Sequence, residues 1–368
     1  MIRVLVVDDS ALMRRLLAEI LSADEGFELD FARGGGEALA MMPTVRPDVV
    51  TLDINMPQMD GLTCLNQIML LHPCPVLMFS SQTAAGAQAT LEALELGAVD
   101  FLAKPSGAVS LTMETVAEAL IEKVRTAAKA KVAKSHRLVE RIRLRSGLEP
   151  RPARASRTAA RPIGCARPSA SLSLAPDAER LVIIGCSTGG PPALDAVLQP
   201  LPADFPFPIV VAQHMPASFT GALAARLDRM CAISVTEVER MVVLEPAKVY
   251  IAKGGADLII SRRGERLVAM PAPSAPQYRW HPSVDRLVES AMTVVEPDRL
   301  TGILMTGMGD DGAAAMTRLR GLGGRTVAEA EETAVVWGMP GELVRMGGAD
   351  YVERVDAIAG RLLSIAGA

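Results

Sequence analysis

IRVLVVDD (residues 2–9), DVVTLDI (48–54) and PVLMFS (75–80) are the stretches that decide the fold of the first third of this chain. Each is a run rich in apolar residues that ends at or beside a carboxylate or a hydroxyl. Two further runs, ELDFAR (28–33) and VDFLAK (99–104), bring the expected strands to five. Helical patterns lie between and after them, near 12–21, 35–42, 61–71, 86–95 and 110–122. This alternation predicts a doubly wound parallel sheet that carries its functional groups at the carboxyl ends of the strands.

A second series of apolar runs begins at Leu181 and again alternates with helical patterns. The expected strands are LVIIG (181–185), PIVVAQ (208–213), KVYIA (248–252), RLTGILMT (299–306) and GRTVAEA (324–330). The segment 247–271 is typical of a hairpin, with Gly254, Gly255 and Gly264 as turn residues. We therefore expect a second doubly wound, mainly parallel α/β domain.

The composition changes sharply between these two halves. Residues 123–167 hold fourteen Lys and Arg but two Glu, and the later part, EPRPARASRTAARPIGCARPSAS (149–171), lacks apolar periodicity. This pattern is typical of a solvated linker, although the first part, about 123–145, is compatible with an extended helix. The predicted division is a first domain over 1–122, a basic linker over 123–178 and a second domain over 179–368.

The overall composition excludes several classes of protein. The net charge of −4 and the pI of about 5.7 give no general attraction to nucleic acid. The apolar runs are shorter than the ~18 residues of a membrane span, and the aspartates at 8 and 9 come too early for a signal peptide. Five cysteines without CxxC spacing favour a reducing cytoplasm over a disulfide framework or a zinc site.

Five polar side chains follow the strands of the first domain: Asp8, Asp9, Asp53, Ser80 and Lys104. A single aspartate at the end of a strand is usually a turn or cap residue, but all five occur in order at strand ends. Mg²⁺ prefers oxygen ligands from one or two carboxylates together with phosphate oxygens, and a lysine and a hydroxyl suit phosphoryl oxygens. The set predicts a magnesium-assisted phosphoryl acceptor.

The second domain carries a serine, a histidine and aspartates at successive strand ends. Ser187 lies in GCSTGG (185–190), which fits the G-x-S-x-G turn that exposes a hydroxyl, and His214 follows PIVVAQ. Either Asp310 or Asp311 of GMGDDG (307–312) supplies an acid to orient the imidazole. A serine needs such a base to act as a nucleophile. The order Ser, His, Asp differs from the Ser, Asp, His order of α/β-hydrolases.

Other interpretations of these motifs are weaker. GMGDDG formally matches the G-x-G-x-x-G dinucleotide motif, but its two aspartates would repel a pyrophosphate. Cys186 has no activating group near it in the sequence and is expected to pack. A transcription factor is disfavoured because the basic stretch is linker-like rather than a helix-turn-helix. A non-catalytic module that binds receptors or accepts phosphate is the alternative to an enzyme.

The first set of motifs resembles the receiver domain of two-component response regulators over nearly all of 1–122. DD, DINMPQMDG (53–61), the serines at 80 and 81 and the following KP carry the likeness. The resemblance implies that Asp53 accepts the phosphoryl group and that Asp8, Asp9, Asp53 and the Asn55 carbonyl hold Mg²⁺. It also implies that Ser80 and Lys104 sense the phosphoryl group, with Phe101 at the aromatic switch position. Ser80 stands where Thr is commoner.

The second set resembles the catalytic domain of the CheB family of chemotaxis protein-glutamate methylesterases, over about 179–368. GCSTGG, QHMP (213–216), HPSVD (281–285), TGMGDDG (306–312) and WGMP (337–340) carry the likeness in order. It implies Ser187 as nucleophile, His214 as general base and Asp311 as orienting acid. Met308 would supply a backbone oxyanion donor, and Thr188 would shape the site. Cys186 stands where a smaller residue is common.

The second departure is Trp280-His281, where the family usually has His-Arg or Tyr-Arg before the proline; the pair is expected to line the substrate cleft. The resemblance as a whole implies a cytoplasmic, phosphorylation-activated hydrolase. It would demethylate glutamyl esters and deamidate glutamines on chemoreceptors, take its phosphoryl group from a chemotaxis histidine kinase, and need Mg²⁺ for phosphorylation but no cofactor for hydrolysis. The receiver is expected to cover the catalytic cleft at rest.

Overall fold

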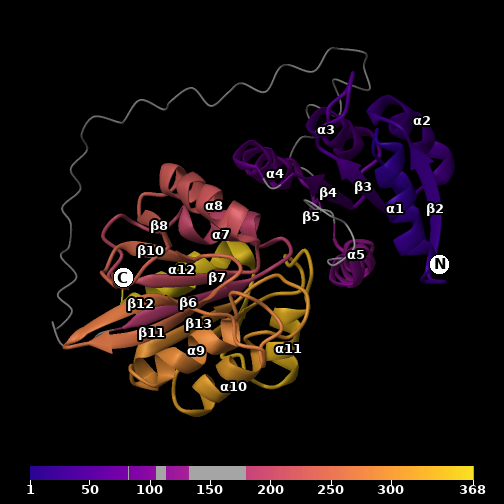
Figure 1. Ribbon diagram of the computed structural model, residues 1–368. Helices are drawn as coiled ribbons and strands as arrows, with labels where there is room; N and C mark the ends of the chain where they lie inside the picture. Colours follow the sequence, from indigo (N-terminus) through magenta and orange to yellow (C-terminus); the bar gives the residue numbers. More distant parts are fainter. Residues whose placement is uncertain (82, 105–112, 132–179, 368) are drawn as a thin grey trace.

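The protein was analysed as a computed structural model, which describes residues 1–81, 83–104, 113–131 and 180–367. Within them lie two α/β domains, each built on its own parallel sheet (Figure 1). Most of the predicted linker, from residue 132 to 179, lies outside the described residues. No helix of the described residues is long and apolar enough to cross a membrane.

The first domain is a five-stranded parallel sheet in the order β2-β1-β3-β4-β5. Its elements are β1 (Ile2–Val7), α1 (Ala11–Ser22), β2 (Phe27–Ala32), α2 (Gly35–Val45), β3 (Val49–Asp53), α3 (Gly61–Leu71), β4 (Val76–Ser80), α4 (Ala84–Leu96), β5 (Asp100–Ala103) and α5 (Met113–Ala127). Polar side chains fix where helices begin: Ser10, Asp60 and Thr83 each accept a hydrogen bond from a first-turn amide. The five predicted strands and helices are present, but α5 continues five residues beyond the expected end at 122.

The second domain is a seven-stranded sheet in the order β15-β14-β13-β6-β7-β10-β8, and every neighbouring pair is parallel. Its strands are β6 (Leu181–Cys186), β7 (Ile209–Gln213), β8 (Ser234–Val238), β10 (Lys248–Ala252), β13 (Leu300–Leu304), β14 (Arg325–Glu329) and β15 (Tyr351–Glu353). Its helices are α7 (Gly190–Leu198), α8 (Ala217–Met230), α9 (Val284–Met292), η1 (Pro297–Arg299), α10 (Ala313–Gly321), α11 (Met339–Arg345) and α12 (Val355–Ala366). Helices α7, α8 and α12 cover one face, and α9, α10 and α11 cover the other (Figure 1).

The predicted hairpin is partly wrong. Strands β11 (Asp257–Arg263) and β12 (Arg266–Ala272) form the antiparallel hairpin around Gly264, and β9 (Val242–Val243) adds to it. Strand β10 instead pairs with β7 and β8 in the main sheet, so Gly254 and Gly255 connect two sheets rather than two arms of one hairpin. The short strands β8 and β15 were not anticipated, because β8 mixes buried and exposed residues over five positions and β15 has three residues, none of them buried.

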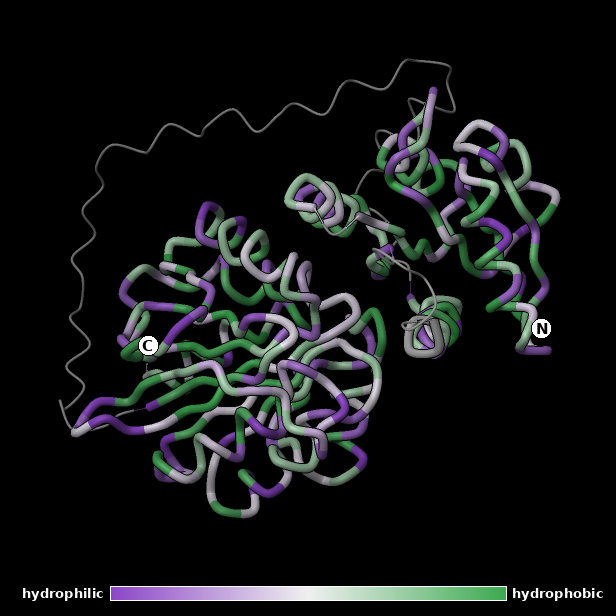
Figure 2. The backbone as a smooth tube through the Cα atoms, viewed as in Figure 1, coloured by the Kyte–Doolittle hydropathy of each residue, from purple (hydrophilic) through white to green (hydrophobic). Residues whose placement is uncertain are grey.

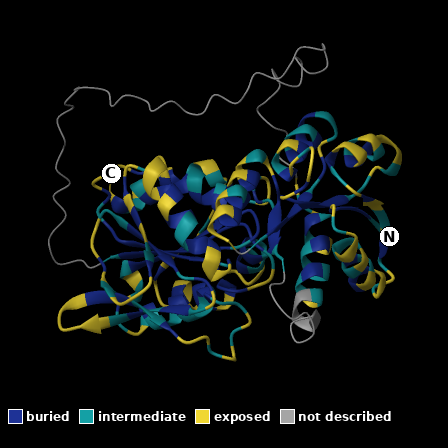
Figure 3. Ribbon diagram, turned by 45° about the horizontal axis from the view of Figure 1, so that its top comes forward, coloured by how far each residue is buried: buried dark blue, intermediate teal, exposed yellow. Residues whose placement is uncertain are grey.

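Hydrophobic residues fill the strands of both sheets, and polar residues gather outside them (Figure 2). All strand residues of β6 and β7 are buried, as expected for a parallel sheet covered on both faces (Figure 3). Chain order reverses beside β6, since β7 lies on one side of it and β13 on the other. The carboxyl ends of these three strands therefore border the crevice where open α/β sheets bind ligands.

Candidate functional site

The acidic pocket lies at the carboxyl end of the first sheet. Carboxylate oxygens of Asp8, Asp9 and Asp53 all lie within 4.8 Å of one another. The Lys104 ammonium is 2.7 Å from Asp53 Oδ2 and 3.2 Å from Asp8 Oδ2. The backbone N–H of Asn55 donates to Asp53 Oδ1 at 3.2 Å. The three carboxylates are suitable ligands for Mg²⁺, and the Lys104 ammonium beside them suits a phosphoryl group. Asp9 is exposed, so the pocket is open to solvent.

Burial and charge act in opposite directions in this pocket. Burial raises the pKa of the Asp53 carboxyl above its usual value, and the contact with Lys104 offsets only part of this rise. Burial alone would lower the pKa of Lys104, but Asp53 and Asp8 together raise it. Lys104 therefore stays charged and compensates two clustered carboxylates.

Two of the three predicted switch residues, Ser80 and Phe101, are buried in different surroundings. Ser80 is fully buried and its hydroxyl donates to the Gly86 carbonyl at 3.1 Å, so it is engaged with the start of α4. Phe101 is buried against Phe219 of α8, with ring centroids 4.4 Å apart. The aromatic side chain therefore belongs to the contact between the two domains.

Ser187, His214 and Asp311 lie at the carboxyl ends of β6, β7 and β13. Ser187 follows β6, and its backbone is held by the Thr306 carbonyl and by the Gln213 amide group, which donates to the Ser187 carbonyl at 2.9 Å. Ser187 and His214 line one cavity of about 290 Å³. His214 Nε2 is 2.8 Å from Asp311 Oδ2. Asp311 thus pairs with one ring nitrogen, whereas Nδ1 of His214 is buried and has no hydrogen-bond partner among the described residues.

The Asp311 carboxylate is held at the start of a helix. It accepts hydrogen bonds from the Ser283 hydroxyl and from the amides of Val284 and Asp285, which begin α9. Burial by itself would raise the pKa of Asp311, but the bonds to His214 and to these amides hold it below its usual value. Its neighbour Asp310 is exposed. Of the two aspartates that the motif offered, only Asp311 thus faces the histidine.

Met308 and Thr188 both lie against the first domain as well as in the cleft. They line the cavity that contains Ser187, in the loops after β13 and β6. The Thr188 hydroxyl donates to Asp100 of β5 at 2.5 Å, and the Thr126 hydroxyl of α5 donates to Met308 Sδ at 2.9 Å. Lys123 of α5, which pairs with Asp100, lines the same cavity. The first domain therefore closes one side of the catalytic cleft.

Cys186 does not compete with Ser187 as a nucleophile. Its side chain is fully buried, lies 3.0 Å from Gln213 Oε1, and burial raises the pKa of its thiol strongly. Gln213 and the α9 amides are site residues that sequence reasoning missed. The HPSVD motif marked the α9 start, but nothing local in it indicates contact with Asp311, about 27 residues away.

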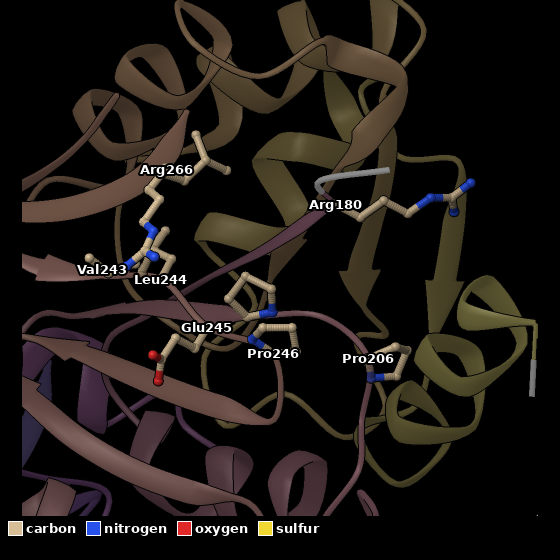
Figure 4. A pocket seen from close by; sticks show the side chains of 9 residues that line it. Arg180, Pro206, Val243, Leu244, Glu245, Pro246 and Arg266 are labelled. Carbon is tan, nitrogen blue, oxygen red and sulfur yellow. The ribbon is translucent and has the colours of Figure 1, made fainter. Parts of the chain in front are cut away.

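Another cavity, of about 340 Å³, lies at the opposite, amino-terminal end of the second sheet (Figure 4). Arg180, Pro206 and Pro208 come just before β6 and β7, and β9 and β12 contribute Val243 and Arg266. In Figure 4 the Arg180 side chain extends away from Glu245 and Arg266. This cavity holds none of the groups described above.

Comparisons with known proteins cover both domains. The response regulator receiver domain family matches residues 4–115, and the CheB methylesterase family matches residues 182–362. A protein-glutamate methylesterase/protein-glutamine glutaminase of Rhodopseudomonas palustris is 53% identical over 99% of this chain and 98% of its own length. A protein of the same description from Rhodospirillum rubrum is 51% identical over 98% of this chain and 95% of its own length. The crystal structure of the Thermotoga maritima CheB methylesterase catalytic domain is 36% identical, covers 50% of this chain and 98% of its own, and has a TM-score of 0.49.

Proposed function

The chain belongs to the CheB methylesterase family, with an N-terminal response regulator receiver domain, and we propose that Ser187, His214 and Asp311 are the catalytic residues of this enzyme. It is a protein-glutamate methylesterase and protein-glutamine glutaminase that acts on chemoreceptors under the control of phosphorylation. The observation that carries the residue assignment is the 2.8 Å contact between His214 Nε2 and Asp311, beside a cavity that His214 and Ser187 line together.

The reaction follows from this arrangement. Ser187 Oγ attacks the glutamyl ester carbonyl while His214 Nδ1 takes its proton, and Asp311 stabilises the resulting imidazolium. The Met308 amide donates to the oxyanion, and Thr188 shapes the adjoining wall. His214 then returns the proton to the leaving oxygen, so methanol departs and an acyl-serine remains. Water, deprotonated by His214, clears the acyl group as a glutamate; a glutamine substrate releases ammonia in the same way.

The receiver controls this site through Asp53. In the proposal Asp8, Asp9, Asp53 and the Asn55 carbonyl would hold Mg²⁺, whose charge would offset that of a phosphoryl group from a chemotaxis histidine kinase. Ser80 and Lys104 contact the phosphoryl oxygens, and Phe101 transmits the change to α8. The hydrogen bond from Thr188 to Asp100 of the receiver, and the place of Lys123 of α5 in the lining of the Ser187 cavity, support a closed resting state, which phosphorylation at Asp53 opens. The same proposal assigns residues 1–122 to the receiver, 123–178 to the linker and 179–368 to the catalytic domain. It also places the protein in the cytoplasm.

Methanol release from methylated chemoreceptor membranes tests the assignment. Wild-type protein, Ser187→Ala and Asp53→Ala are compared with and without acetyl phosphate and Mg²⁺, and Ser234→Ala, an exposed serine of β8, is the matched control. We expect no release with Ser187→Ala, and basal release without stimulation with Asp53→Ala. Activity that persists in Ser187→Ala would refute the nucleophile. No methanol release from wild type, with the biological effect intact in Ser187→Ala, would support the non-catalytic alternative.

A further inference from the structure

The indole of Trp280 lies flat against the catalytic imidazole. The ring centroids of His214 and Trp280 are 5.2 Å apart and the ring planes differ by 13°. Both side chains line the cavity that contains Ser187. The rings of His214 and Trp280 are thus stacked. In the part of the chain that the structure describes, the two other ring pairs, both between phenylalanines, are tilted or edge-on.

The imidazole of His214 is therefore held in two directions. Asp311 binds Nε2 in the plane of the ring, and Trp280 restrains the ring from its face. A contact in the plane limits translation but still permits tilting about the Nε2–Oδ2 axis. The indole opposes this tilting, which would otherwise move Nδ1 away from Ser187.

Both chain neighbours of Trp280 form contacts that bear on the position of the indole. The Arg279 guanidinium lies over the indole, 4.9 Å from the ring, and forms an ion pair with Glu122 of α5 at 2.8 Å. On the other side, His281 Nδ1 is 2.9 Å from Asp257, whose side chain is fully buried. The indole position is thus determined by the second domain through Asp257, and the exposed Arg279–Glu122 pair adds little.

We propose that Trp280 is a positioning residue that holds the plane of His214 and stabilises its cationic form during catalysis; this rests on the proposed role of His214 as the base. The face of an indole carries negative electrostatic potential and attracts a cation. As the base, His214 gains a positive charge when it takes the Ser187 proton. The attraction is therefore stronger in the transition state than in the ground state, so it acts on kcat rather than on KM.

The first experiment compares Trp280→Leu and Trp280→Phe in the full chain. Methanol release is measured against receptor concentration, with and without acetyl phosphate. We expect Trp280→Leu to lower kcat about tenfold at a KM within about twofold, and Trp280→Phe to keep most of the activity, since a phenyl face still attracts a cation. Both the basal and the stimulated rates should fall by the same factor.

Other roles of Trp280 give different results and would overturn the proposal. A residue that only binds the receptor would raise KM and leave kcat unchanged. A residue that only closes the two domains would change the ratio of stimulated to basal rates. Thermal melting of each variant shows whether a fall in rate reflects loss of the folded protein.

A second measurement does not depend on the natural substrate. The rate at which a fluorophosphonate inactivates Ser187 reports the activation of this hydroxyl by His214, and Trp280→Leu should lower the rate about tenfold. If wild-type protein reacts with the fluorophosphonate but releases no methanol, the substrate assignment fails while the role of Trp280 is still measured. Equal inactivation rates for wild type and Trp280→Leu would overturn the role of Trp280.

Fluorescence tests the stack directly. Trp280 and Trp337 are the two tryptophans of the chain, so Trp280 alone emits in a Trp337→Phe background. We expect His214→Leu in that background to change the emission, because the imidazole ring that contacts the indole is then removed. Unchanged emission would mean that the rings do not stack in solution.

Discussion

Replacing Glu95 by Gln should raise the basal esterase activity, because Glu95 links the receiver to the catalytic domain. Arg226 of α8 is 5% exposed in its side chain and contacts Asp195 of α7, in its own domain, and Glu95 of α4, across the interface at 2.5 Å. The substitution leaves Arg226 neutralised by Asp195, so neither domain keeps an uncompensated buried charge. The change therefore acts mainly on the contact between the domains.

The size of the effect follows from the exposure of the pair. The Glu95 side chain is 48% exposed, so water screens the attraction, and the pair is closer to a surface ion pair than to a buried one. Loss of about 1 kcal/mol from the closed state shifts the closed–open equilibrium about fivefold. If most molecules are closed at rest, the basal rate rises by about the same factor, whereas the rate with saturating acetyl phosphate stays unchanged.

The assay is initial methanol release from methylated receptor membranes, without phosphodonor and with saturating phosphodonor. Glu92→Gln is the matched control, because Glu92 is exposed on the same helix and loses the same charge. The reasoning is refuted if Glu95→Gln leaves the basal rate unchanged, or if Glu92→Gln raises it by the same factor. A lower rate under saturating phosphodonor would mean that Glu95 serves the open state instead.

Three further predictions concern metal, packing and pH. Chelation of Mg²⁺ should abolish the stimulation by acetyl phosphate and leave the basal rate of methanol release intact, since the proposal uses Mg²⁺ only in the phosphorylation of Asp53. Gly190→Ala should destabilise the protein by about 1–3 kcal/mol in chemical denaturation, because the added Cβ would lie 2.0 Å from Gln213 Oε1; an unchanged midpoint would contradict the packing. Burial raises the pKa of Asp285 to about 6, so between about pH 4 and 6 this carboxyl binds more protons in the folded than in the unfolded state. The free energy of unfolding should therefore fall as the pH rises through this range. Asp285→Asn should flatten this part of the stability curve, measured by melting between pH 4 and 7.

Much of the fold was predictable because the information is local in the chain. Apolar runs of strand length, such as Val4–Val7, alternate with helical patterns whose first residues carry their own caps, such as Asp60. These features also place Asp53, Ser187 and His214 at the ends of their strands. The hairpin failed for the same reason: a parallel strand such as β10 and a hairpin arm have similar local patterns, and only pairing with β7 and β8 separates them.

The sequence by itself determined the two α/β domains, the family and the chemical types of the site residues. Only the tertiary structure decided which groups meet: the α9 amides hold Asp311, the indole of Trp280 covers His214, and Asp100 of the receiver binds Thr188. The physical reason is that these contacts join residues 27 to 88 positions apart, and they form only after packing has ordered both partners. Local propensity and motif spacing do not predict such pairings. They form only in the folded chain, where they surround the hydroxyl of Ser187.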